Sequence, residues 1–219
     1  MMDLTARASL LKSVINDLLR HKKEMDSHFR AFCEPYKIVE GVASKENLRK
    51  IFILSIQARG GPRLSNTKCR GVLKEFDSAI DGILELSSEG QHKVNELVRR
   101  IDDIKYIGPK ITALFLRDAV YYFHIWPDLV NYLYLPIDRH IRTILIKKLR
   151  AMGEEEVPYP SGSFFRGENP RFQSFLSEVH RPRIQFDYLW HVGARFCTYR
   201  LSEICELCPI NRHCKDRYE

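Results

Sequence analysis

Four cysteines near the C-terminus have the spacing of a metal site. Cys197, Cys205, Cys208 and Cys214 are separated by gaps of 7, 2 and 5 residues, in a chain with six cysteines in all. Thiolates this close together can hold an iron–sulfur cluster or a zinc ion. Structural zinc sites generally use two Cys-x-x-Cys pairs or mixtures of cysteine and histidine, and this loop contains one such pair. The cysteines alone therefore predict a metal centre of either kind.

A lysine stands where it could act as a nucleophile. Ile104–Lys110 joins two expected helices through a very short turn, in which we expect Gly108 to adopt a conformation that a β-carbon would resist. Pro109 suits the first helical turn that follows, where outward N–H groups offer a site for a phosphate. Lys110 would lie at the positive end of the helix dipole, which favours the neutral amine that forms a Schiff base. The alternative is an ordinary turn whose lysine contacts a phosphate.

Asp138 is the second candidate for chemistry. It lies in Pro136–Ile141, directly before an amphipathic segment, so we expect it to cap that helix. Most such aspartates only cap. The functional interpretation is a carboxylate held in fixed geometry near Lys110.

The elements that must position these residues are helical. Apolar residues recur at steps of three and four, which predicts an all-α fold, and no alternating segment is long enough to indicate a sheet. We expect a short helix over Asn66–Phe76 and a new helix start near Ser78 and Asp81. The aromatic residues of segment 119–135 are expected to pack in the core, with stacking in a base pocket as the alternative.

Composition limits the classes of protein. The 219 residues carry a net charge of +7 and a pI near 9.1, which suits a phosphate backbone or another anionic partner. No apolar stretch is long enough to span a bilayer, and the N-terminus does not read as a secretory signal. Clustered cysteines without an export signal favour reduced thiols. We therefore expect a cytoplasmic, nucleoid-associated protein, nuclear in a eukaryote, and not a secreted or membrane protein.

Taken together, these segments resemble the helix–hairpin–helix DNA glycosylase superfamily, and most closely its endonuclease III branch with a [4Fe–4S] cluster. The hairpin and lysine lie in Ile104–Leu116, the aspartate in Pro136–Ile141, and the cysteines in Cys197–Cys214. Ile53–Ala58 resembles the family's Leu-Ser-x-Gln segment, and Leu189–Gly193 resembles the helix before the cluster. The matches follow the family's order over roughly residues 45 to 215, and the ordered set is more specific than any one motif.

The resemblance implies a base-excision repair enzyme that swings a damaged nucleotide out of double-stranded DNA. It implies that Lys110 attacks the sugar C1′, expels the base and forms a Schiff base that permits β-elimination, with Asp138 assisting. It also implies that the four cysteines hold a [4Fe–4S] cluster, with zinc less favoured. The DNA contacts that it suggests, alone or with the basic surface, are Gln57, Arg59, Tyr106, Ile107, Gly108, Pro109, Arg212 and Lys215.

Three departures from the family pattern leave alternatives open. Lys105 and Tyr106 replace the proline and first glycine of the family hairpin, and the first cysteine gap is one residue longer than usual. Oxidised pyrimidines are the first substrate expected. Lys110 and Asp138 are 28 positions apart (138 minus 110), longer than is common in that branch, which makes 8-oxoguanine the second candidate, beside a mismatched base. The rivals from other classes are a non-catalytic helix–hairpin–helix DNA-binding module and a zinc-stabilised scaffold.

The expected organisation is a two-lobed helical glycosylase fold. One domain, residues 35–135, would be a six-helix barrel with the helix–hairpin–helix. The other would combine residues 1–34 with 136–219 and carry the cluster loop at 197–214. We expect a monomer whose partner is DNA with a damaged base or an abasic site.

Overall fold

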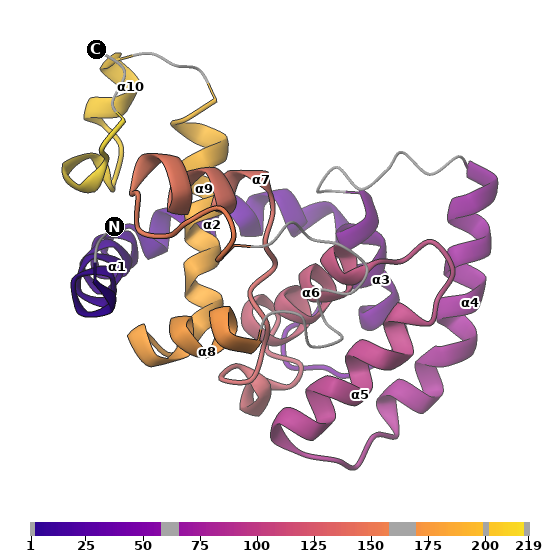
Figure 1. Ribbon diagram of the computed structural model, residues 1–219. Coiled ribbons are helices and arrows are strands. Elements are labelled where there is room, and N and C mark those ends of the chain that lie inside the picture. Colours follow the sequence, from indigo (N-terminus) through magenta and orange to yellow (C-terminus); the bar gives the residue numbers. More distant parts are fainter. Residues whose placement is uncertain (1–2, 58–65, 158–169, 199–201, 217–219) are drawn as a thin grey trace. The chain divides into compact units, whose positions relative to one another are not determined.

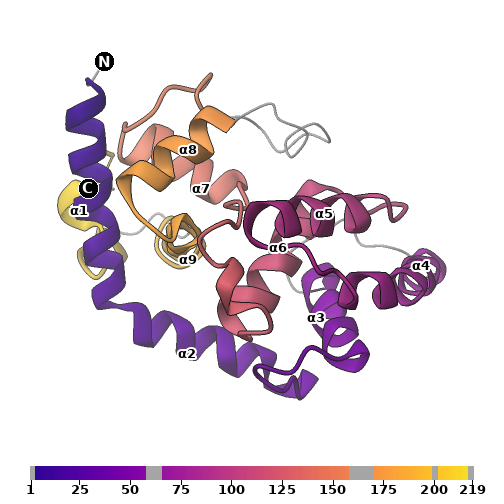
Figure 2. The same cartoon turned by 90° about the horizontal axis from the view of Figure 1, so that it is seen from below.

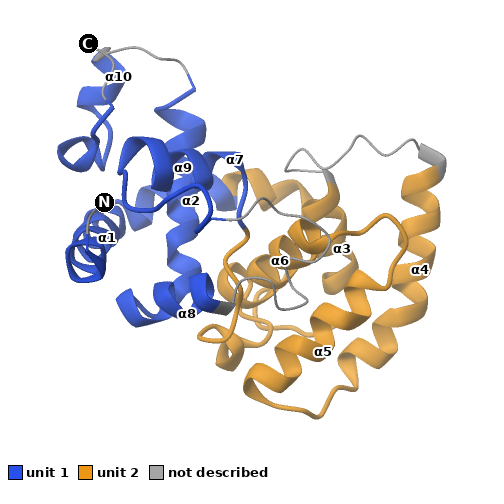
Figure 3. Ribbon diagram, in the orientation of Figure 1, with its two compact units in different colours: residues 1–30, 137–219 blue, residues 31–136 orange. Residues whose placement is uncertain are grey.

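The computed structural model describes residues 3–57, 66–157, 170–198 and 202–216 (Figure 1). The chain divides into two compact units (Figure 3). One comprises residues 31–136, and the other comprises residues 1–30 together with 137–219. The expectation of an all-α protein is confirmed, because the regular elements in the described ranges are all helices.

We call residues 1–30 with 137–219 the split unit and residues 31–136 the central unit. The α-helices of the split unit are α1 (Leu4–Arg20), α2 (Lys22–Cys33, which crosses the limit between the units), α7 (Arg139–Thr143), α8 (Pro170–Val179), α9 (Tyr188–Arg195) and α10 (Ser202–Glu206). The α-helices of the central unit are α3 (Lys45–Gln57), α4 (Asn66–Leu84), α5 (Gly90–Asp102) and α6 (Pro109–Arg117). Two π-helical turns follow α6 and α7 directly, at Asp118–Tyr122 and Ile144–Lys148.

The expected break near Ser78 is wrong, because α4 continues without interruption to Leu84. The Ser78 hydroxyl donates to the Lys74 carbonyl one turn earlier, at 3.0 Å, instead of capping a new helix. Asp81 pairs with Lys45 of α3, at 2.6 Å. Capping residues on the exposed face of a helix do not end it when its apolar stripe is continuous. That buried stripe runs through Val72, Phe76, Ile80 and Ile83.

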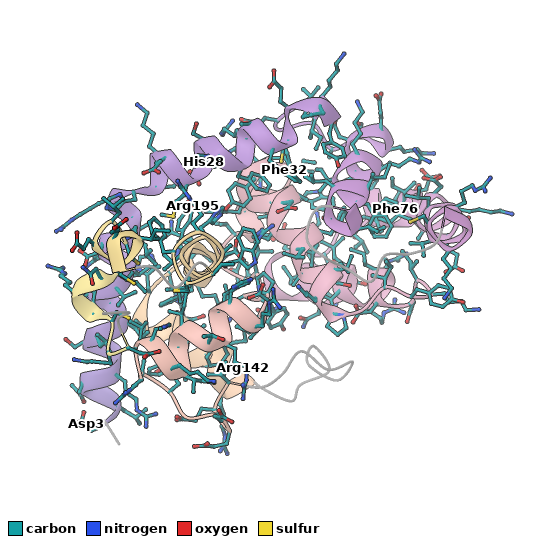
Figure 4. All side chains as sticks on the ribbon, turned by 90° about the horizontal axis from the view of Figure 1, so that it is seen from above. Asp3, His28, Phe32, Phe76, Arg142 and Arg195 are labelled. Atoms are coloured by element: carbon teal, nitrogen blue, oxygen red, sulfur yellow. The ribbon has the colours of Figure 1, made fainter. Side chains whose placement is uncertain are left out.

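Three phenylalanines from three helices hold the core of the central unit together. Phe76 of α4, which is labelled in Figure 4, stacks on Phe52 of α3 with ring centroids 3.9 Å apart. Phe115 of α6 meets both rings edge-on, at 5.8 and 5.6 Å. Aromatic clusters of this kind fix the positions of the helices that carry them. Here they anchor α6, the helix that begins beside the candidate nucleophile.

Three of the six aromatic residues of segment 119–135 pack in the core, as expected. Tyr122, Phe123 and Trp126 are buried, whereas Tyr132 is 39% exposed. The buried members belong to the core of the central unit and are not free to line an open pocket.

In the split unit, α1 presents an apolar face whose residues are fully buried. Asp3 caps the helix by accepting a hydrogen bond from the Ala6 N–H at 2.8 Å. Helix α7 and helix α9 approach closely at Gly193, where an added β-carbon would meet the His140 Cβ at 2.6 Å. Glycine at this position therefore lets α9 lie against the helix that Asp138 begins. The buried apolar residues of α1 are Leu11, Val14, Ile15 and Leu18.

Candidate functional site

The connection between α5 and α6 is a tight hairpin, but its strained residue is not the expected one. Gly108 has φ −118° and ψ 173°, an extended conformation open to any residue, and a β-carbon there would meet nothing within 4 Å. The left-handed conformation falls on Tyr106, with φ 70°. The expectation that Gly108 supplies the unusual backbone conformation is therefore wrong: the chain turns two residues earlier, at a position where the resembled family has glycine.

Tyr106 projects from the hairpin close to two cations. Its side chain is 51% exposed. The ammonium groups of Lys68, on α4, and of Lys105 each lie 5.2 Å from its ring centroid. A left-handed conformation is uncommon for a bulky residue. The hairpin thus displays an aromatic ring and positive charge together, a combination suited to nucleic acid.

A side chain of helix α4 also contacts the backbone of the hairpin. Glu75 accepts a hydrogen bond from the Lys105 N–H at 2.8 Å, and the Ile107 N–H donates to the Ile104 carbonyl at 3.0 Å. Ile107 is itself buried. Neither amide is therefore open to a phosphate. Within the described residues, the N–H groups of Tyr106, Gly108 and Lys110 donate no hydrogen bond, and they are the amides that could meet an anion.

Lys110 occupies the first turn of α6, directly after Pro109. Its side chain is partly exposed, whereas every residue from Ile111 to Arg117 is buried. The helix is tied to α5 at this end, because the Thr112 hydroxyl donates to Asp102 Oδ1 at 2.5 Å. The first turn of α6 is thus held against α5, and it carries an amine that a substrate could reach.

Asp138 caps α7 as expected. Its Oδ1 accepts hydrogen bonds from the His140 and Ile141 N–H groups at 2.8 and 3.0 Å, and the residue is 8% exposed. No described group donates to its other oxygen, Oδ2. The carboxylate is therefore fixed through one oxygen and keeps the second for another partner. Lys110 belongs to the central unit and Asp138 to the split unit.

The four clustered cysteines line one small cavity of about 20 Å³ in the split unit. Cys197 follows α9, and Cys205 lies in α10. A turn joins Cys205 to Cys208, whose N–H donates to the Cys205 carbonyl at 3.1 Å, and Cys214 follows a 3₁₀ turn. All four thiols are free and partly buried. No three His, Cys, Asp or Glu side chains in the described ranges are arranged to hold a metal ion.

Burial in the wall of the cavity favours the protonated thiols of Cys197 and Cys208. Burial raises the pKa of Cys208 to about 12, and the other three thiols of the cavity act in the same direction. Burial also raises the pKa of Cys197, whereas the positive charge of Lys148 acts to lower it. Metal binding requires thiolates, so a metal bound in this cavity would release protons.

Helix α1 holds the cysteine loop in place (Figure 2). Asp17 accepts two hydrogen bonds from the Arg212 guanidinium, both at 2.8 Å, and lies 2.8 Å from His213 Nε2. Burial alone would raise the pKa of Asp17, but the hydrogen bonds from His213 and Arg212 lower it below its usual range. The Arg212 head group is thus paired within the protein, while the side chain of Lys215 is exposed.

Sequence analysis did not identify Glu75, which contacts the hairpin, or Asp17, which contacts the cysteine loop. Glu75 and Asp17 lie on amphipathic helices, and nothing near them in sequence indicates their partners. Gln57 is the last residue of α3, and its side chain lies outside the described part of the structure, as does Arg59.

Comparisons of the chain with protein-family models, with curated proteins and with solved structures gave no significant match. Among the described residues, no helix is both long and apolar enough to cross a membrane.

Proposed function

We propose that this protein is a DNA glycosylase with abasic-site lyase activity, of the helix–hairpin–helix type that its sequence resembles. The observation that carries the proposal is the position of Lys110. It is a partly exposed amine in the first turn of α6, beside hairpin N–H groups that donate no hydrogen bond within the described residues. A nucleophile placed next to a phosphate-binding element can be brought to the sugar of a nucleotide in DNA.

The hairpin would bind the DNA backbone. The amides of Tyr106, Gly108 and Lys110 supply hydrogen-bond donors, and α6, nine residues long, adds its positive dipole end. Lys68 and Lys105 add charge that does not depend on sequence. This set of groups suits an enzyme that searches DNA for damage rather than for a base sequence.

Lys110 would then act on an extruded nucleotide. The amine nitrogen attacks C1′ of the deoxyribose and the bond from C1′ to the base breaks, so the base leaves with the electron pair. Loss of a proton from nitrogen and opening of the sugar ring give the Schiff base. Removal of a C2′ proton then expels the 3′ phosphate by β-elimination, which cleaves the strand.

Asp138 would stabilise the positive charge that develops on the sugar. Its Oδ1 is occupied by the two amides that it caps, which fixes the carboxylate and leaves Oδ2 for the substrate or for a proton. A carboxylate that is already oriented needs little reorganisation as charge develops, which is the basis of electrostatic catalysis.

The cysteine cavity fits a [4Fe–4S] cluster in its donor set. Four thiols and largely apolar walls surround one space, and four thiolates are the usual ligands of such a cluster. Within the described ranges the side chains form no three-ligand group for a single ion, which favours a cluster bridging the cavity over one zinc ion. Cys197, Cys205, Cys208 and Cys214 would hold the cluster, which would order the loop and take no part in the reaction.

A base-release assay with a panel of duplexes tests the proposal. The panel carries, in turn, an oxidised pyrimidine such as thymine glycol, 8-oxoguanine, a mismatched base and no lesion. We expect release from the oxidised pyrimidine first and from 8-oxoguanine second, followed by strand cleavage at the vacated site. Tight duplex binding without base release or cleavage on any member would instead assign a non-catalytic DNA-binding module.

Substitution of Tyr106 distinguishes an effect on DNA binding from an effect on stability. Tyr106→Asn keeps a residue that tolerates the left-handed conformation but removes the ring, so we expect the free energy of unfolding to stay within about 1 kcal/mol of the parent. We expect affinity for duplex DNA, measured by fluorescence anisotropy at fixed salt, to fall at least about fivefold, since stacking on an aromatic ring is worth roughly 1–3 kcal/mol per base. Tyr132→Asn, at another exposed tyrosine of the central unit, is the control. Equal affinities in the two variants would remove Tyr106 from the interface.

A further inference from the structure

Lys148 is a buried cation in the wall of the cysteine cavity. It ends the π-helical turn Ile144–Lys148 and lines the cavity together with the four cysteines. Its side chain is only 5% exposed. Its ammonium donates to the backbone carbonyl of Asp216 at 3.0 Å and to Asp216 Oδ2 at 2.9 Å.

Burial of the Lys148 ammonium carries an energetic cost. Removing a charged group from water costs several kcal/mol unless a partner offsets it, by order of magnitude. Asp216 is one partner, but its side chain is 51% exposed, so water screens its charge from the outside. On the inner side Lys148 lines the same cavity as the four cysteines, where little water weakens the interaction between charges.

We propose that Lys148, held by Asp216, is the charge-compensating group of this metal centre. The inference rests on the cluster assigned above and adds a residue outside its four ligands. A protonated lysine has no lone pair, so Lys148 acts through its charge and not as a ligand. Groups around a cluster set its potential through net charge and hydrogen bonding.

The direction of the effect follows from the charge. A nearby cation stabilises the more negative, reduced form of a cluster, so its removal makes the cluster easier to oxidise. Lys148→Met should therefore shift the midpoint potential to more negative values and accelerate oxidative loss of the cluster. The main-chain bond from the Lys215 N–H to the Lys148 carbonyl, at 2.6 Å, does not involve the side chain and keeps the loop tied to the turn in this variant.

The experiment compares four proteins after anaerobic reconstitution with iron and sulfide. They are the parent, Lys148→Met, Lys148→Arg and Lys147→Met, which removes the same charge from the exposed neighbour on the same turn. The readouts are the midpoint potential, the rate at which ferricyanide bleaches the blue–violet absorbance, and thermal unfolding without the cluster. We expect Lys148→Met to bleach at least threefold faster than the parent with the potential shifted as above, and the other two variants to stay close to the parent.

The outcomes separate this inference from the proposals on which it rests. Equal shifts in Lys148→Met and Lys147→Met would overturn it, because burial of the charge would then be irrelevant. If Lys148→Met takes up no cluster but Lys148→Arg does, charge is again the requirement. If neither does, shape is the requirement and the inference is wrong. Absence of the absorbance from all four proteins would remove the cofactor together with this inference, whereas base release would still be judged by the duplex panel.

Discussion

Replacing Cys208 with alanine is expected to abolish the cluster and destabilise the split unit. Cys208 is one of four thiols around the cavity, and a cluster with three protein ligands leaves one iron open to solvent and oxidant. We expect loss of nearly all blue–violet absorbance. We also expect the free energy of unfolding to fall by more than about 4 kcal/mol relative to the loaded parent, because metal binding to such a loop is coupled to its folding.

Absorbance, bound iron and thermal unfolding of the purified variant check this result. Cys69→Ala is the matched control, since Cys69 is a partly buried cysteine on α4 of the central unit and does not line the cavity. It should keep the parent's absorbance and iron content. A Cys208→Ala protein with unchanged absorbance and iron would contradict the assignment of this residue as a ligand.

Asp138→Asn is expected to slow base release by about 10² to 10⁴-fold with little change in stability. An asparagine oxygen can still accept the hydrogen bonds from His140 and Ile141, so the cap of α7 survives. What disappears is the negative charge on the oxygen that the cap does not use. Single-turnover base release on the best duplex of the panel measures the effect, and thermal unfolding measures the stability.

A second N-cap aspartate provides a control for the capping role of Asp138. Asp3 caps α1 in the same unit, through a 2.8 Å bond from the Ala6 N–H. Asp3→Asn should leave the rate of base release unchanged. If both asparagine variants release the base at the parental rate, Asp138 is a structural cap and has no part in catalysis.

Helical periodicity predicted the fold class because most helices bury a continuous apolar stripe. The false start at Ser78 shows the limit of local signals: a serine next to acidic residues is typical of a helix start, but the stripe from Val72 to Ile83 overrides it. The limits expected for the central domain were 35–135, and the compact unit comprises residues 31–136.

The candidate site divides into local and long-range parts. The N-cap at Asp138 and the start of α6 at Pro109 depend on neighbouring residues and could be predicted from sequence. The left-handed Tyr106 could not, because sequence rules assign that conformation to glycine. The clamp of Asp17 on Arg212 joins residues 195 positions apart, a pairing for which no local pattern exists.

The central claim is a Schiff base on Lys110, and borohydride reduction on a duplex with one abasic site tests it most directly. Borohydride converts the Schiff base into a stable amine, which denaturing electrophoresis detects as a covalent protein–DNA complex. We predict a trapped complex with the parent and none with Lys110→Ala, while Lys105→Ala, at the exposed lysine of the same hairpin, still forms it. Trapping that persists in Lys110→Ala, or is absent from the parent despite tight binding to the duplex, would contradict the account.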